Sequence, residues 1–153
     1  MIRNSKNLPR IIIDSSTLFS AIYNRKGNEA HLLELADLGR CEIILLDYVL
    51  EEIDSVFRRK GLDIELVYDL LDNIENITIS TLEEITVDEI SISRKLINDP
   101  LDRPIFIFVI REIATDDDTF FVTGDKGFFR DEVKEELKGR LLHTTEVISL
   151  IQN

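Results

Sequence analysis

Short apolar runs alternate with longer amphipathic segments along most of this chain. Runs of four or five residues, rich in Ile, Val, Leu and Phe, predict strands at 10–13, 42–46, 76–80 and 119–122, and a short fifth strand is predicted at 140–143. A strand that is buried on both faces is apolar throughout instead of alternating, and such strands are typical of parallel sheets.

The segments between these runs predict helices. They cover about 15–23, 29–38, 47–60, 63–72, 82–98, 102–114, 126–137 and 146–151. The stretch 82–98 fits neither period cleanly and is assigned as helix. The stretch 102–114 could be a strand by its β-branching, but its length, Pro104 and its acidic start favour a buried helix. Strands alternating with helices predict βαβ units, an α/β fold with helices on both faces of the sheet, and one domain over 1–153.

The formal net charge of −12 changes what this fold could bind. A protein that grips nucleic acid tightly usually carries a basic patch. The acidic excess therefore argues against tight, nonspecific nucleic-acid binding. It permits transient catalysis on a phosphodiester through metal ions, or a basic protein partner.

Other classes of protein are disfavoured by what the sequence contains. The longest apolar run, 105–110, is far below the ~18 residues of a membrane span. The single cysteine, Cys41, excludes an internal disulfide and fits a cytoplasmic location. His31 and His143 share no motif with a cysteine, so we expect no zinc site. Neither a Ser/His/Asp triad nor a Gly-rich phosphate-binding loop is evident.

Four acidic residues stand where a parallel sheet would bring them together. Asp14 follows the first predicted strand directly, and Asp125 follows the fourth after Thr123 and Gly124. Glu52 lies on one predicted helix, and Asp102 begins another. Ligands of open α/β sheets bind beyond the carboxyl ends of the strands. Carboxylates at that edge repel one another unless a cation lies among them, and Mg²⁺ or Mn²⁺ is the natural choice. The pattern predicts a metal-dependent phosphodiester hydrolase.

Each of these acids also has a purely structural interpretation. Asp14 and Asp125 could cap the helices or turns that follow them. Near Pro100, either Asp99 or Asp102 could cap the next helix, where the helix dipole favours an acid. The acidic run 116–118 lies at the other end of the fourth strand, and we expect a solvated loop there.

Helical periodicity separates Glu51 from Glu52. On a helix, one apolar face is formed by Val49, Leu50, Ile53, Val56 and Phe57. Glu52 lies at the edge of this face, where a carboxylate is costly unless it is paired or bound to metal. Glu51 points away and is predicted to be solvated. The alternative for Glu52 is a surface pair with Lys or Arg.

Three cationic residues are the best placed to contact a substrate phosphate. Lys126 and Arg130 share a predicted helix face next to Asp125, and Arg103 follows Asp102. The alternative for each is solvated surface.

Taken together, the acidic strings resemble PIN-domain proteins over nearly the whole chain. The matching segments are 11–16, 50–57, 99–105 and 121–128. The resemblance implies a three-layer α/β/α sandwich with a central parallel sheet of about five strands. It also implies a Mg²⁺- or Mn²⁺-dependent ribonuclease that cleaves single-stranded RNA. Many small members, the VapC-like proteins, are toxins of toxin–antitoxin pairs and are often homodimers.

The resemblance also implies roles for individual residues. Asp14, Glu52, Asp102 and Asp125 would bind the metal and carry catalysis, and Thr123 would orient the site. An antitoxin with a basic segment would be the protein partner, and no membrane would be involved.

In two places the chain departs from the family pattern. Ser16 stands where many members have Asn, and the predicted helix 102–114 carries Phe106 and Phe108 where small residues are common. Two rival functions remain. The first is a non-catalytic PIN-like interaction module that binds metal weakly. The second is a receiver-like phosphoacceptor using Asp14, although the acidic pair expected before its strand is not evident.

Overall fold

A five-stranded parallel sheet forms the centre of the computed structural model, which describes residues 8–152. The strands are β1 Arg10–Ile13, β2 Glu42–Leu46, β3 Ile77–Ser80, β4 Thr119–Val122 and β5 Leu141–Leu142. Their order across the sheet is β3-β2-β1-β4-β5. This differs from the flavodoxin-like order 2-1-3-4-5 of receiver domains, so the fold does not support the receiver-like interpretation.

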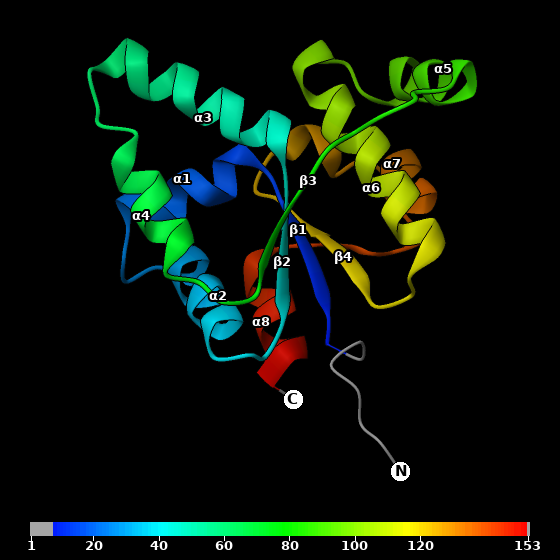
Figure 1. Cartoon of the computed structure of the whole chain (residues 1–153). Coiled ribbons are helices and arrows are strands. Elements are labelled where there is room, and N and C mark those ends of the chain that lie inside the picture. The colour runs from blue at the N-terminus through cyan, green and yellow to red at the C-terminus, as the bar shows by residue number, and fades with distance from the viewer. Residues whose placement is uncertain (1–7, 153) are drawn as a thin grey trace.

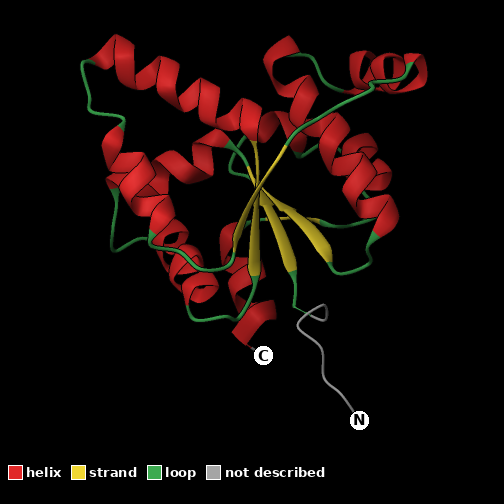
Figure 2. Ribbon diagram, viewed as in Figure 1, coloured by secondary structure: helices red, strands yellow, loops and turns green. Residues whose placement is uncertain are grey.

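Helices cover both faces of this sheet. They are α1 Ser15–Tyr23, α2 Asn28–Asp37, α3 Asp47–Lys60, α4 Glu65–Asp72, α5 Val87–Leu96, α6 Arg103–Thr115, α7 Asp131–Glu136 and α8 Thr144–Gln152. Figure 1 shows α1, α2 and α4 on one side of the strands and α5, α6 and α7 on the other, and α8 packs beside α2. Figure 2 shows the same three layers by type of element. The expected three-layer α/β/α sandwich is therefore confirmed. Among the described helices, none has the length and apolar character needed to cross a bilayer.

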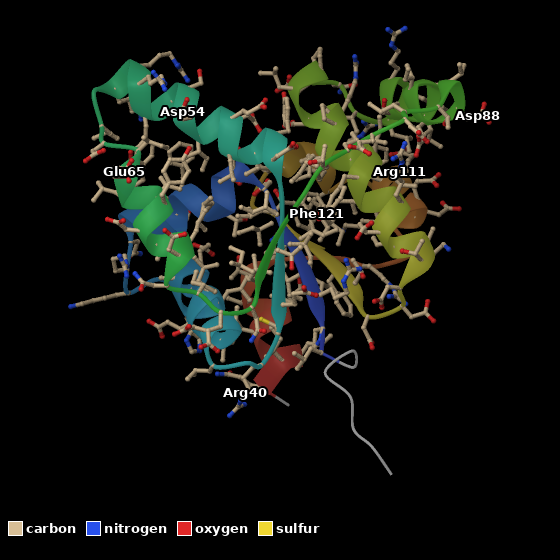
Figure 3. All side chains as sticks on the ribbon, viewed as in Figure 1. Arg40, Asp54, Glu65, Asp88, Arg111 and Phe121 are labelled. Carbon is tan, nitrogen blue, oxygen red and sulfur yellow. The ribbon has the colours of Figure 1, made fainter. Side chains whose placement is uncertain are left out.

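The core lies where the strands meet the helix layers. Ile11, Ile12 and Ile13 of β1 are fully buried, as the continuous apolar run predicted. Figure 3 places Phe121 of β4 at the centre of the molecule, whereas the labelled Asp54, Glu65 and Asp88 lie at its periphery. Phe106 and Phe108 of α6 are buried too, so the core accommodates these two bulky side chains.

One predicted helix is interrupted in the structure, and another is preceded by a 3₁₀ turn. The segment 126–137 is a 3₁₀ turn, η3 Lys126–Phe128, followed by the separate helix α7. Phe128 is drawn into the core, where its ring packs edge-on against Phe121 with centroids 5.1 Å apart. The segment 102–114 is preceded by a second 3₁₀ turn, η2 Pro100–Asp102, before α6 begins.

The ambiguous stretch 82–98 is helical only over α5. This helix begins with a capping box in which Thr86 and Glu89 exchange side-chain and backbone hydrogen bonds. Glu89 is further held by Arg111 of α6, at 2.6 Å between Oε2 and Nε. Residues 82–86 form an irregular connection in which Glu84 has a φ of +52°, so the irregular periodicity there reflects a loop.

Candidate metal centre

Asp14 is fixed at the end of the central strand β1. Its carboxylate, in a residue that is 7% exposed, accepts hydrogen bonds from the Thr17 backbone N–H at 3.0 Å and from the Thr17 hydroxyl at 2.9 Å. Ser16 Oγ donates to the same oxygen at 2.9 Å. Asp14 therefore caps α1. The capping interpretation is correct, and it also holds the carboxylate rigidly at the sheet edge.

Thr123 joins Asp14 to Asp125. Because β1 and β4 are parallel neighbours with Ile13 opposite Val122, the residues that follow them lie side by side. The Thr123 hydroxyl donates to Asp14 Oδ2. It also accepts from the backbone N–H of Asp125 at 3.0 Å. One buried hydroxyl therefore sets the relative position of two predicted metal ligands.

Glu52 and Asp102 complete the cluster from α3 and the start of α6. Burial raises the pKa of Glu52 to about 7, and the charges of Asp14 and Asp99 add to this effect. Burial likewise raises the pKa of Asp102 to about 7, with further contributions from Asp125 and Asp99. Asp125 therefore lies near Asp102, as Asp14 lies near Glu52. The structure thus brings all four predicted acids together.

Within residues 8–152, no Lys, Arg or His forms an ion pair with any acid of this cluster. An all-carboxylate donor set is the kind that Mg²⁺ and Mn²⁺ prefer. Among the described residues, however, no three side chains of His, Cys, Asp or Glu lie close enough together to hold a metal ion. The chemistry of the donors fits a hard divalent cation, and closing a cage around it would need side-chain movement.

Sequence reasoning missed two members of the cluster. Asp99, which the sequence left as an alternative cap, raises the pKa of both Glu52 and Asp102. It caps η2 as well, accepting from the Leu101 N–H at 3.0 Å. Tyr48 lies among the same acids, and its pKa is raised by burial and then by Glu52 and Asp102. The available signal was spacing, because Tyr48 lies one helical turn before Glu52.

The helix phase predicted for α3 is confirmed. Glu51 is exposed, whereas Glu52 is partly buried beside the buried Ile53. The solvated loop predicted over 116–118 is confirmed for Asp117 and Asp118, which are exposed, whereas Asp116 is half-buried and pairs with Arg10 at 3.8 Å. Asp118 lies at the opposite end of β4 from Asp125, where its carbonyl accepts from the Arg10 N–H at 2.8 Å.

Two of the three candidate phosphate ligands are directed at backbone. Arg103 donates to the carbonyls of Ile97 at 2.9 Å and Asn98 at 3.3 Å. Arg130 Nη1 donates to the carbonyl of Leu96 at 2.7 Å. These carbonyls end α5, where a helix leaves its acceptors without internal partners. Both guanidinium groups therefore brace the segment that leads into Asp99 and Asp102.

Lys126 is the third candidate, and it remains exposed beside Asp125. No ion pair in the described part of the chain involves its ammonium group. Of the three cations it is the freest to meet a phosphate, and that role remains a prediction for all three.

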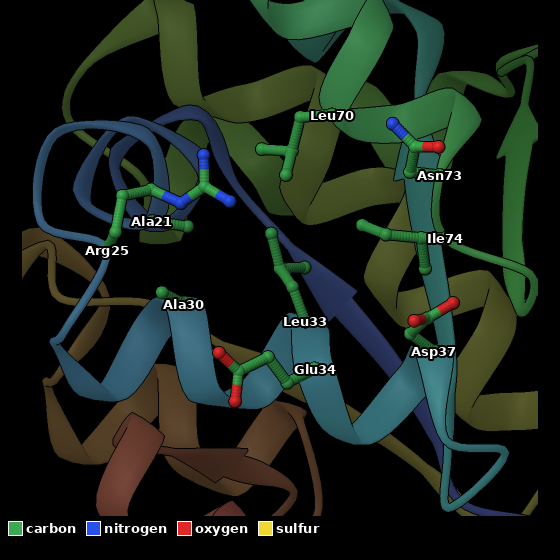
Figure 4. Close-up of a pocket in the computed structure, with 9 residues that line it drawn as sticks. All are labelled: Ala21, Arg25, Ala30, Leu33, Glu34, Asp37, Leu70, Asn73 and Ile74. Atoms are coloured by element: carbon green, nitrogen blue, oxygen red, sulfur yellow. The ribbon is translucent and has the colours of Figure 1, made fainter.

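A separate hollow of about 160 Å³ lies between α1, α2 and α4, and Figure 4 shows its lining. Leu33, Leu70 and Ile74 form apolar walls, and Arg25 and Glu34 lie at its margin. It contains none of the clustered acids, so it is distinct from the candidate metal centre.

Comparison with known proteins supports the fold. No protein-family model matches this chain, and no curated protein sequence matches it. Among solved structures, it is similar to a chain in the crystal structure of VapBC2 from Rickettsia felis bound to a DNA fragment from their promoter. The sequences are 17% identical, the match covers 88% of this chain and 98% of that one, and the TM-score is 0.59. A likeness at this identity establishes a shared α/β fold.

Proposed function

We propose that this chain is a PIN-type endoribonuclease that depends on Mg²⁺ or Mn²⁺ and cleaves single-stranded RNA. One observation carries the proposal. Acids from separate parts of the chain gather at the C-terminal edge of a parallel sheet, and no basic side chain within residues 8–152 pairs with them. Such an arrangement is costly in the absence of a cation. The fold shared with a VapBC2 chain supports the same conclusion.

Asp14, Glu52, Asp102 and Asp125 would hold the cation. A bound Mg²⁺ or Mn²⁺ supplies Lewis-acid polarisation of a phosphate and lowers the pKa of a coordinated water. Thr123 and the α1 N-terminus keep Asp14 in a fixed orientation, so that little reorganisation of this ligand is needed.

Two side chains are suited to proton transfer. In the cation-free protein the carboxyl groups of Glu52 and Asp102 each titrate at about pH 7, close to neutrality. A group of this kind can accept a proton and release it again near physiological pH. We assign the general base to whichever of the two is less engaged in cation binding.

The acidic balance suggests a protein partner. With a net charge of −12, the chain repels an extended RNA backbone and attracts a basic protein segment. We propose an antitoxin that inserts Arg or Lys among the clustered acids and displaces the cation. The structural relative was crystallised as the VapBC2 assembly, which supports a partner of this kind.

A second candidate is a non-catalytic interaction module on the same fold. The observation in its favour is that no three side chains of His, Cys, Asp or Glu among residues 8–152 form a ready metal cage. Such a module would keep the cluster as a docking site for basic groups and would not cleave RNA.

The experiment compares three proteins on a mixed pool of single-stranded RNA in Mn²⁺, with and without EDTA. They are the wild type, Asp125→Asn and the control Asp118→Asn, which makes the same change at the opposite end of β4. We expect cleavage by the wild type and the control only, and none in EDTA. Equal cleavage by Asp125→Asn would reveal a contaminating nuclease. Absence of cleavage by all three would favour the interaction module.

A further inference from the structure

A pocket of about 400 Å³ opens directly beside the acid cluster. Its lining residues are Ser16, Thr17, Ser20, Glu29, Gly124, Asp125 and Thr144. It is continuous with the candidate metal centre, because Asp125 belongs to both and Ser16 donates to Asp14. If a ligand binds the acid cluster through a phosphate, the chemical group attached to that phosphate would lie in this pocket.

The lining contains hydroxyl groups and carboxylates but neither lysine nor arginine. Ser16 and Ser20 lie one turn apart on α1 and are both exposed, so their hydroxyls face the same space. Glu29 reaches it from the first turn of α2 and is half-buried. A phosphate would be repelled here. A neutral group rich in hydroxyls can donate to Glu29 and exchange hydrogen bonds with the serines.

Gly124 leaves room for close approach. Its backbone is outside the left-handed region, so the turn itself does not require glycine. A Cβ at this position would meet no atom of the protein within 4 Å. The packing of the chain therefore does not explain the missing side chain, whereas a ligand lying against the backbone would.

We propose that this pocket binds the ribose next to the scissile phosphate and selects RNA over DNA, with the Glu29 carboxylate accepting a hydrogen bond from the 2′-hydroxyl. Ser20 provides a second polar contact, and Gly124 allows the sugar to lie against the end of β4. This inference rests on the proposed function and adds the residue that determines the sugar specificity. A carboxylate is well suited to this role because a hydrogen bond to a charged group is stronger than a neutral one.

The test measures cleavage of one single-stranded sequence made as RNA and as DNA, in Mn²⁺. The wild type is expected to cleave the RNA faster by at least about tenfold. Glu29→Ala and Glu29→Gln should lose most of this ratio through slower RNA cleavage, with DNA cleavage unchanged. The matched control is Glu34→Ala, which removes the same charge from an exposed position on the same helix. An equal change on RNA and DNA in the Glu29 variants would mean that only general charge was altered, and the ribose site would be rejected.

Gly124→Ala provides an independent arm. Its melting temperature should match or exceed that of the wild type, because the added methyl meets open space. RNA cleavage should nevertheless fall at least about fivefold, as the order of magnitude of one lost close contact. In contrast, Gly61→Ala should lower the melting temperature and keep the activity, because Gly61 has a φ of +66° and lies at the end of α3. Full activity in Gly124→Ala would contradict the proposal.

A binding measurement can test the ribose site separately from the proposed nuclease activity. Fluorescence anisotropy with labelled RNA and DNA oligonucleotides is measured on Asp102→Asn, alone and combined with Glu29→Ala. If the wild type does not cleave RNA, the nuclease proposal fails, but the ratio of the two affinities still decides the ribose site. A preference for RNA that disappears with Glu29→Ala supports it. A ratio that Glu29→Ala leaves unchanged overturns it.

Discussion

At the N-terminal ends of the strands, acidic side chains surround Arg10, whereas at the C-terminal ends they surround one another. Arg10, which begins β1, pairs with Glu112 at 2.7 Å, Glu42 at 3.6 Å and Asp116 at 3.8 Å. Four residues later, just past the opposite end of the same strand, Asp14 faces other carboxylates, and the described residues 8–152 give it no basic partner.

This difference separates acids that support the fold from acids held ready for a ligand. Carboxylates around Arg10 gain a compensating charge from the chain itself, so folding is enough to satisfy them. Glu52 and Asp102 gain none, and their raised pKa values record the cost of keeping them ionised. A folded chain that keeps such a cluster is ready to gain free energy when a cation arrives.

The largest effect is expected from a substitution in the acid cluster at the C-terminal ends of the strands. Glu52→Gln should reduce Mn²⁺-dependent RNA cleavage by about 100-fold or more, equivalent to about 2.7 kcal/mol of barrier. Glu51→Gln removes the same charge from the exposed side of α3 and should keep most of the activity. Initial rates on a labelled RNA would be compared, with circular dichroism to verify folding. Equal losses in both folded variants would show that the site does not depend on Glu52.

Cation binding should be the next largest effect. Because only the native state presents the cluster, Mn²⁺ at 100 times its Kd should stabilise the protein by about 2.7 kcal/mol. Asp14→Asn should remove most of the Mn²⁺-induced rise in melting temperature, and it should not lower the stability of the cation-free protein by much, since repulsion is relieved. Asp117→Asn, at the other end of the sheet, should leave the rise intact. A melting temperature that millimolar Mn²⁺ leaves unchanged would favour the interaction module.

Removing the ion pairs of Arg10, at the N-terminal ends of the strands, should lower stability without changing RNA cleavage. Arg10→Ala leaves Glu112, Glu42 and Asp116 without their shared cation. Its side chain is 23% exposed, so we expect a loss of about 1–3 kcal/mol, less than for a fully buried pair. Urea unfolding would measure this, with the exposed Arg40→Ala as a control expected to change stability by less than about 0.5 kcal/mol. Loss of cleavage in a folded Arg10→Ala protein would contradict the separation of the two ends.

The smallest expected effect is on the pH dependence of stability. Glu52 and Asp102 have folded pKa values near 7, above the unfolded values of 4.5 and 3.8. The native state therefore holds protons that the unfolded chain releases earlier, so stability falls as pH rises from about 4 to 7. Glu89 acts in the opposite sense, because Arg111 lowers its pKa to about 2, and its contribution is lost as pH falls from 4.5 toward 2.

Without divalent cations, the melting temperature should thus be highest near pH 4–5 and lower at pH 7.5. Both carboxyl groups are partly solvated, so the decrease should be on the order of 1 kcal/mol, or about 2–4 °C. Calorimetry across this range would show it, and saturating Mn²⁺ or Asp102→Asn should flatten the curve. A melting temperature that climbs steadily from pH 5 to 7.5 would rule out the raised pKa values.

The sequence by itself determined the parts of this protein that depend on local pattern. The strands β1, β2 and β4 were predicted with their observed bounds, because each is a continuous apolar run flanked by polar residues. The choice of Glu52 over Glu51 required only the helical period. The placement of Asp14 and Asp125 at the same edge of the sheet required only the rule that parallel strands end at the same edge. That their strands β1 and β4 are neighbours came from the structure.

Only the tertiary structure decided features that depend on contacts between distant segments. The helix predicted over 126–137 divides because Phe128 packs against Phe121, a contact that no local period contains. Arg103 and Arg130 turn to the end of α5 because its unpaired carbonyls lie within their reach. Asp99 and Tyr48 join the cluster because three separate elements converge there. The pKa of a carboxyl group depends on burial and on neighbouring charges, so it exists only once the chain has folded.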